Sequence, residues 1–293
     1  MLLLLPLLAA LLPVAQDQCG AREPAPGLLV SADWLKRHRQ DSGLVILQAE
    51  RSRAPFDSAH PAGARFIAMG DFSITRGDLL TELPPLEQLD ALLESLGVGE
   101  RGRIILTGET LPVTRLFFTL DYAGLGGRVS VLDGGVAAWR AAGGALGSRR
   151  TPAAKRASLT LHPEPARLAD ADWVAAHRED PGVVLLDARS KEEFDGSVSE
   201  AGVSRPGHIP GARQLEWSVL LSDGRFRSKE ELRSLLAGLG MTADKQLVTY
   251  CRVGTRATAA YFAARLLGYQ VRLYDGSMNE WAAKSGLPVE KPN

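Results

Sequence analysis

The sequence predicts an α/β protein made of two tandem domains, each with a mostly parallel central sheet flanked by helices. The chain has 293 residues and is 45% hydrophobic, which is enough for two cores of ordinary size. Short apolar segments alternate with stretches of helix-forming residues, a pattern typical of parallel sheets covered on both faces. An internal repeat relates the two halves of the chain, so we expect the same fold twice.

The repeat begins with residues 32–47 and 171–186, in which nine of sixteen positions are identical. Each segment predicts a short helix, a turn with glycine and then an apolar strand. Two further pairs follow in the same order, namely His60 to Arg65 with His208 to Arg213, and Val129 to Trp139 with Val271 to Trp281. The repeat therefore predicts equivalent elements throughout both halves.

The predicted strands lie at residues 44–47, 104–106, 129–132, 183–186, 247–250 and 271–274. Helices are expected at residues 86–96, 229–239 and 257–267, the last of them ended by Gly268. The first domain is expected at residues 27–145 and the second at 165–290. Residues 146–164 read as a linker, because Arg149, Arg150 and Pro152 stand there without an apolar pattern.

Residues 1–24 are interpreted as a signal peptide with a short leader. Met1 to Val14 is almost unbroken leucine, alanine and proline, which is too short to span a bilayer, and cleavage is expected after Ala15. No lysine or arginine precedes this run. We expect a periplasmic or secreted protein without stable membrane insertion after cleavage. The alternative is a misassigned start codon and a cytoplasmic protein.

Charge and cysteine usage exclude several classes of function. Lysine plus arginine and aspartate plus glutamate both number 34, so the chain has no basic field of the kind that nucleic acid requires. The two cysteines, Cys19 and Cys251, give no zinc-type pairing, and we expect neither a metal nor an organic cofactor. Cys19 lies in the leader, and a disulfide to Cys251 would disable the second thiol.

Cys251 is the principal candidate for chemistry. It ends a predicted buried strand, and a tight segment with Gly254 separates it from a predicted helix. Free backbone amides and the positive end of the helix favour negative charge at such a junction, and the thiolate is the nucleophilic form of cysteine. A lone cysteine is more often a small buried hydrophobe. Two cations, Arg252 and Arg256, favour the reactive interpretation.

These residues give the chain its resemblance to the tandem-domain rhodanese family, the thiosulfate sulfurtransferases. Residues 207–212, Gly-His-Ile-Pro-Gly-Ala, resemble the N-terminal signature of the family. Residues 271–281 resemble its C-terminal signature, with Met278 where an aromatic residue is usual. Residues 251–256, Cys-Arg-Val-Gly-Thr-Arg, are similar to its active loop. The resemblance covers most of residues 27–290 and implies two rhodanese-like domains.

The repeat also predicts which half is active. Counting back from Asp275-Gly276 reaches Cys251, and the same count from Asp133-Gly134 reaches Glu109. A glutamate cannot carry a sulfane sulfur, so we expect the first domain to be catalytically inactive and to support the second.

The resemblance implies transfer of a sulfane sulfur from thiosulfate to cyanide or a thiol through a persulfide on Cys251, in a ping-pong scheme. The active loop, residues 252–256, is expected to bind substrate through its backbone amides. Arg252, Val253, Gly254, Thr255 and Arg256 make up this loop. Arg256 is expected at the mouth of the site, because a guanidinium matches a sulfonate. The animal thiosulfate enzyme has a lysine in place of Val253.

Two further arginines are candidate substrate cations. Arg189 follows Asp187 and either binds substrate or braces the loop through an ion pair with Asp187. Members of the family use an arginine where this chain has Glu193, and Arg205 is a possible substitute for it. His208 is interpreted as a structural residue in a turn rather than as a general base.

Other functions remain open alternatives. A cysteine phosphatase needs five residues between cysteine and arginine, whereas four separate Cys251 from Arg256. A 3-mercaptopyruvate sulfurtransferase favours small uncharged residues after the cysteine, and this chain has Arg252. A third alternative is a persulfide carrier or binding module that turns over small molecules slowly. The expected partners are a small anionic donor and a thiophilic acceptor, and we expect a monomer.

Overall fold

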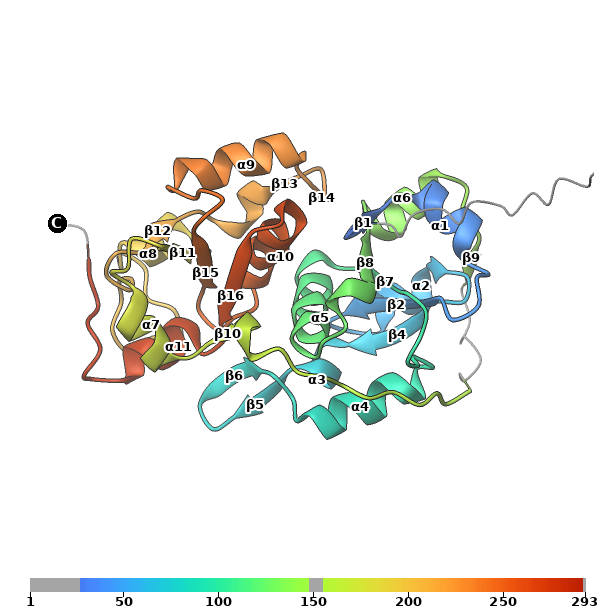
Figure 1. The fold of residues 1–293 in the computed structure, drawn as a ribbon, viewed down its shortest axis with the longest axis horizontal. Coiled ribbons are helices and arrows are strands. Elements are labelled where there is room, and N and C mark those ends of the chain that lie inside the picture. The colour runs from blue at the N-terminus through green and yellow to red at the C-terminus, as the bar shows by residue number, and fades with distance from the viewer. Residues whose placement is uncertain (1–26, 148–154, 292–293) are drawn as a thin grey trace, which may run out of the picture.

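The computed structural model describes residues 27–147 and 155–291 of the chain (Figure 1). The predicted signal peptide, Cys19 and the basic cluster of the predicted linker lie outside these residues, so export of the protein stays a prediction. Among the described residues, no helix has the length and apolar character needed to cross a membrane.

The first half contains a five-stranded parallel sheet with strand order β1-β8-β7-β2-β4. Its strands are β1 (Leu29–Val30), β2 (Val45–Glu50), β4 (Arg65–Ala68), β7 (Ile104–Gly108) and β8 (Val129–Leu132). Its helices are α1 (Ala32–His38), α2 (Ala54–Ser58), α3 (Met69–Phe72), α4 (Leu86–Ser95), α5 (Thr110–Tyr122) and α6 (Gly135–Ala141), with the 3-10 turn η1 (Gly126–Arg128). Small antiparallel pairs join β3 (His60–Pro61) to β9 (Leu146–Gly147) and β5 (Ile74–Arg76) to β6 (Leu79–Glu82).

The second half repeats this sheet with the strand order β10-β16-β15-β11-β12, again all parallel. Its strands are β10 (Leu168–Ala169), β11 (Val183–Asp187), β12 (Arg213–Gln214), β15 (Gln246–Tyr250) and β16 (Gln270–Tyr274). Its helices are α7 (Ala171–His177), α8 (Lys191–Phe194), α9 (Lys229–Gly238), α10 (Ala257–Leu267) and α11 (Ser277–Ala283), with the 3-10 turns η2 (Pro165–Arg167) and η3 (Trp217–Leu220). One antiparallel pair joins β13 (Leu221–Ser222) to β14 (Arg225–Phe226). The predicted fold class is confirmed.

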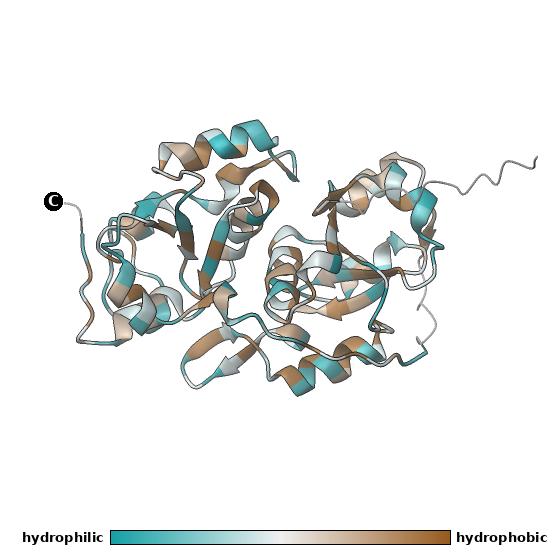
Figure 2. Cartoon of the chain, in the orientation of Figure 1, coloured by the Kyte–Doolittle hydropathy of each residue, from teal (hydrophilic) through white to brown (hydrophobic). Residues whose placement is uncertain are grey.

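Apolar residues are concentrated on the central strands of each half and on the helices that cover them (Figure 2). In the second half, β15 lies between β11 and β16, and Leu247 and Val248 have no exposed surface. A parallel strand that is buried on both faces reads as a continuous apolar run, which is why this segment was recognisable in the sequence. The strand end at Cys251 is therefore held at the centre of the sheet.

The two halves pack through α5 and α10, which face each other at the centre of the molecule (Figure 1). The rings of Phe117 and Phe262 meet edge to face with their centroids 4.8 Å apart. The hydroxyls of Thr114 and Thr258 are 2.8 Å apart. Both helices are largely buried, and they belong to one apolar core that includes residues of both sheets. The halves thus share a core rather than meeting at a polar surface.

Each half also extends a β-hairpin towards the other. The β5–β6 hairpin of the first half reaches the loop after Cys251, where the Thr81 hydroxyl donates a hydrogen bond to the Val253 carbonyl. The β13–β14 hairpin of the second half reaches the carboxyl ends of β7 and β8, where Arg225 donates to Asp133 at 2.6 Å. Each hairpin thus covers the carboxyl end of the central strands in the sheet of the other half.

Candidate active site

Cys251 lies at the carboxyl end of β15, directly before the loop of residues 252–256 that leads into α10. It is a free cysteine and its side chain has no exposed surface. The position at the end of a central parallel strand and before a helix N-terminus is the usual place for a ligand in such sheets. The thiol is therefore placed where an anion would be stabilised.

The backbone of the loop that follows Cys251 carries donors without partners. The amides of residues 252–256 make no hydrogen bond to any residue in the described ranges. Buried amides are nearly always paired, so a run of unpaired ones indicates a ligand or solvent site. Gly254 has φ +81°, and a Cβ there would overlap the Asp275 carboxylate. The tight curve of the loop thus requires glycine at residue 254.

Helix α11 holds the base of the loop in place. The Ser277 hydroxyl accepts a hydrogen bond from the Cys251 amide at 3.1 Å. The amides of Met278 and Asn279 donate to the Cys251 and Arg252 carbonyls at 3.0 and 2.9 Å. Ser277 adopts a left-handed backbone conformation with φ +52°, which is uncommon for a residue other than glycine. This contact was not predicted from the sequence, in which the repeated Asp-Gly-Gly and Asp-Gly-Ser triplets are the signal that marks the position.

Replacing Ser277 with alanine should lower kcat/KM for sulfur transfer by about ten-fold, because a buried amide loses its acceptor at the nucleophile. Steady-state kinetics measure the effect. Ser277→Gly is the matched variant, since it also lacks the hydroxyl but relaxes the left-handed backbone. Equal losses in both variants are expected. Full activity in Ser277→Gly would show that the hydroxyl has no role.

The first half contributes a buried ion pair beneath the loop. Arg115 of α5 bonds to both carboxylate oxygens of Asp275, with Nη2 3.0 Å from Oδ2. The side chains of Arg115 and Asp275 are 0% and 5% exposed. A Cβ on Gly254 would lie 3.3 Å from Nη1 of Arg115, so the ion pair forms the floor of the loop. No pattern in the sequence indicates that Arg115 and Asp275 meet.

Arg252 and Arg256 both lie at the mouth of the loop, but their guanidinium groups are already paired with carboxylates. Arg256 bonds to both oxygens of Glu193 at 2.7 Å and to Glu200 at 3.1 Å. Burial opposes the charge of Arg256, yet hydrogen bonding to Glu193 and negative charge on Cys251 outweigh it, and the pKa of Arg256 is raised. Arg252 donates to the Ala201 carbonyl at 2.9 Å and lies 3.5 Å from Glu200.

The other two candidate cations have structural contacts instead of facing the site. Arg189 is buried and donates to Asp187 at 2.6 Å and to the Gly207 carbonyl at 2.8 Å, which matches the bracing alternative. Arg205 donates to four main-chain carbonyls around the end of α11. The acceptors are residues Trp281, Ala282, Lys284 and Leu287. The expectation that Arg205 substitutes for the family's arginine is corrected: it anchors the C-terminal segment, because carbonyl oxygens occupy its guanidinium.

His208 is buried and packs face to face on Phe194, with ring centroids 3.6 Å apart. Its Nδ1 lies 2.8 Å from the Phe194 carbonyl. In the first half, His60 repeats the arrangement on Phe56, with centroids 3.9 Å apart and Nδ1 2.8 Å from the Phe56 carbonyl. A contact that recurs in both halves belongs to the fold rather than to the chemistry of one site.

The corresponding position in the first half is Gly108, not Glu109. Ile104 pairs with Val129 in β8, as Leu247 pairs with Val271 in β16, so Gly108 takes the place of Cys251. The prediction of Glu109 was wrong by one residue, because the segment that joins β7 to β8 is one residue longer than the segment that joins β15 to β16. Gly108 has φ +122°, and a Cβ there would overlap the Ala49 carbonyl. This position therefore has no room for a nucleophilic side chain.

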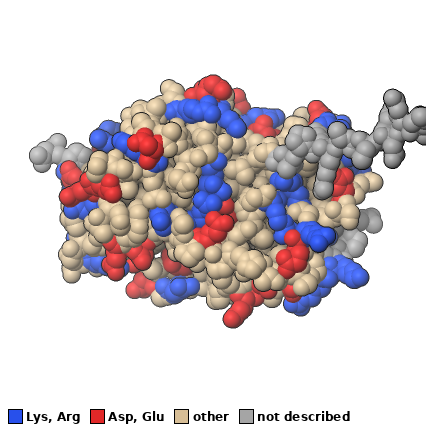
Figure 3. Space-filling model, viewed as in Figure 1, with Lys and Arg blue, Asp and Glu red and all other residues tan. Residues whose placement is uncertain are grey.

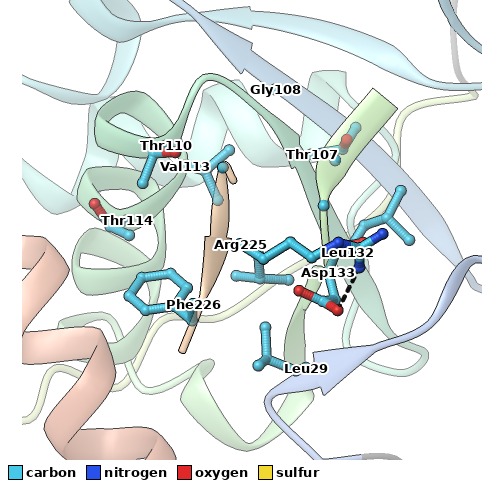
Figure 4. Close-up of a pocket in the computed structure, with 14 residues that line it drawn as sticks. Leu29, Thr107, Gly108, Thr110, Val113, Thr114, Leu132, Asp133, Arg225 and Phe226 are labelled. Carbon is cyan, nitrogen blue, oxygen red and sulfur yellow. Dashed lines mark hydrogen bonds and ion pairs between the residues drawn. The ribbon is translucent and has the colours of Figure 1, made fainter. Parts of the chain in front are cut away.

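Helix α5 begins at Thr110, so the first half has no open loop of amides after its strand. A cavity of about 30 Å³, large enough for a water molecule, lies beside Gly108 and Thr110 (Figure 4). The Arg225–Asp133 ion pair from the β13–β14 hairpin borders it (Figure 4). In the described part of the chain, no group of three or more His, Cys, Asp and Glu is placed to hold a metal ion.

Comparison with known proteins agrees with this geometry. The family model described as a rhodanese-like domain matches residues 170–284. The sulfur carrier protein TtuD of Thermus thermophilus is 33% identical over 286 residues, which cover 91% of this chain and 97% of the relative. A protein of Haloferax volcanii, provisionally named a thiosulfate sulfurtransferase, is 30% identical over 290 residues, covering 92% and 98%.

Solved structures show the same fold. The anaerobic ergothioneine biosynthesis enzyme of Chlorobium limicola superposes with a TM-score of 0.81 at 24% identity, over 91% of this chain and 70% of that one. The wild-type structure of EanB gives the same TM-score and identity, over 91% and 69%. A duplicated parallel sheet, a cysteine before a loop of free amides, and relatives of nearly the same length lead to one conclusion. The chain belongs to the rhodanese family of sulfurtransferases.

Proposed function

We propose that the protein transfers a sulfane sulfur from thiosulfate to cyanide or a thiol through a persulfide on Cys251. The observation that carries this proposal is the run of amides at residues 252–256 that have no partner among the described residues, directly after a cysteine at a strand end. Such preorganised dipoles stabilise charge on a bound sulfur without reorganisation during the reaction. The relatives named for thiosulfate support the same donor.

In the first step, the Cys251 thiolate attacks the outer sulfur of thiosulfate. A sulfur–sulfur bond forms to Cys251, the sulfur–sulfur bond of thiosulfate breaks, and sulfite leaves with the bonding electron pair. In the second step, the acceptor attacks the outer sulfur of the persulfide. Cyanide then leaves as thiocyanate, and the Cys251 thiolate is restored. The loop amides stabilise negative charge on sulfur in both steps.

The same chain is expected to act as a monomer, because its own first half completes the active site. Arg115 and Thr81 both come from the first half and contact the active loop or its floor. A second copy is not needed to supply any of these contacts.

A second candidate is a sulfur carrier that holds a persulfide for a partner protein. The name of the Thermus thermophilus relative favours it. 3-Mercaptopyruvate remains an alternative donor. A donor panel separates these functions. The rate of thiocyanate formation from cyanide is measured with thiosulfate and with 3-mercaptopyruvate as donors. Rapid thiocyanate formation from thiosulfate is expected. A stable persulfide without turnover would favour the carrier. A faster reaction with 3-mercaptopyruvate would identify this compound, and not thiosulfate, as the donor.

A further inference from the structure

The mouth of the active site contains two positive and two negative groups. Arg252 and Arg256 follow Cys251 in the loop, and Glu193 and Glu200 lie opposite them. Across the visible surface, lysine and arginine are likewise interspersed with aspartate and glutamate, without an extended area of one sign (Figure 3). An anionic donor therefore meets arginines whose charge is already compensated.

The two carboxylates differ in how firmly they are held. Glu193 belongs to α8, where it exchanges hydrogen bonds with Ser190, and its side chain is 8% exposed. Burial acts to raise the pKa of Glu193, but hydrogen bonds from Arg256 outweigh it and hold the pKa at about 2. Glu193 is thus a permanent counter-ion of Arg256.

Glu200 is the more loosely held of the pair. It lies outside the helices and strands, its side chain is 26% exposed, and its contact with Arg256 is 3.1 Å, against 2.7 Å for Glu193. The charged groups that face it are Glu193, Arg256 and Arg252. Burial and the neighbouring Glu193 raise the pKa of Glu200 to about 7. Near neutral pH, Glu200 therefore exchanges between an ionised form, which competes with an anionic donor for the arginines, and a protonated form, which does not.

We propose that Glu200 determines how strongly the site binds anionic donors, because it occupies Arg252 and Arg256 until the sulfonate end of the donor takes its place. The inference rests on the proposed thiosulfate chemistry at the same site. The donor dianion binds more tightly when Glu200 leaves the arginines, because Glu193 already pairs with Arg256 and a third negative group there would be repelled.

The surroundings of Arg252 leave room for this exchange. A groove of about 530 Å³ is lined by Arg252, by Ala201 and Gly202, which follow Glu200 in the chain, and by Asp78 and Leu80 of the hairpin from the first half. The Glu200 side chain is itself 26% exposed, so its carboxylate can turn towards solvent when it leaves the arginines. Glu193 keeps its pairing with Nη1 and Nη2 of Arg256 throughout, and the departure of Glu200 frees only the second contact of Nη2.

Thiosulfate binding to the Cys251→Ser variant tests the proposal, because this variant has no thiol in the active loop to react with the donor. Isothermal titration calorimetry gives Kd at pH values of roughly 6 and 8, on either side of the Glu200 pKa. Adding Glu200→Gln should tighten thiosulfate binding by about three-fold at the higher pH, as expected for removal of a partly exposed competing ion pair. Binding should weaken with rising pH only where Glu200 is present.

The matched control is Glu192→Gln, which removes the same charge from α8 at an exposed position that does not face the arginines. It should leave Kd unchanged at both pH values. Equal thiosulfate binding with and without Glu200→Gln overturns the inference, even if the wild-type protein turns thiosulfate over. Tighter binding in Glu200→Gln supports it even if the wild type forms no thiocyanate, a result that would count against the proposed function alone.

Discussion

Replacing Cys251 with serine should lower sulfur transfer from thiosulfate to cyanide by at least about a thousand-fold, because removal of a covalent nucleophile costs this much or more. A serine hydroxyl has nearly the same size, so the loop should keep its shape. Its oxygen cannot form a persulfide, and the ping-pong route is closed. Thiocyanate formation measures the effect, and circular dichroism with thermal unfolding verifies that the variant remains folded.

Cys19→Ser is the matched control for this substitution. It removes the other cysteine of the chain, which lies in the predicted leader, and it should leave activity unchanged. Substantial activity in Cys251→Ser, or its loss in Cys19→Ser, would place the nucleophile elsewhere.

Replacing Arg115 with methionine should lower the free energy of unfolding by about 3–5 kcal/mol, because the buried Asp275 carboxylate loses its partner. Arg115 is supplied by the first half and lies beneath the active loop of the second, so activity should fall together with stability. Urea unfolding measures the free energy, and kcat/KM measured well below the unfolding midpoint reports the state of the loop.

The double variant Arg115→Met/Asp275→Asn distinguishes the ion pair from simple loss of packing. Neutralising Asp275 removes the unpaired buried charge, so the double variant should recover part of the lost stability. A double variant no more stable than Arg115→Met would assign the effect to packing of the Arg115 side chain. An unchanged free energy in Arg115→Met itself would contradict the role of the ion pair.

The central strands and the helix after Cys251 were predictable because each carries a complete local signal. Residues 247–250 form a continuous apolar run, and residues 257–267 are helix formers ended by Gly268, which has φ +85°. The structure places β15 and α10 at these positions. The internal repeat added what local patterns lack, namely that the same sheet occurs twice.

The contacts between the halves could not be predicted, since they join residues far apart in the sequence. The Arg115–Asp275 pair and the hydrogen bond from Thr81 to Val253 depend on how two complete domains pack. The position equivalent to Cys251 was also misplaced by counting, because one residue more or less in a loop shifts the register by one. Only the strand pairing identifies Gly108.

The arginines show the same limit in chemical terms. Their proximity to Cys251 predicts a positive mouth, and Arg252 and Arg256 do lie there. Whether a guanidinium is free depends on the acceptors folded against it, and these come from another segment. Glu193 and Glu200 compensate the positive charge at the mouth of the active site. Arg205 donates its hydrogen bonds to main-chain carbonyls instead. Residue type and spacing therefore indicated the loop but not its net charge.

The most direct test of the central claim is the intact mass of the protein after incubation with thiosulfate and removal of excess donor. We expect that one sulfur atom is added per chain, that peptide mapping finds it on Cys251, and that cyanide removes it as thiocyanate. Cys251→Ser should gain no mass. Absence of added sulfur in the wild type, or sulfur on Cys19 instead of Cys251, would rule out a persulfide on Cys251 as the intermediate.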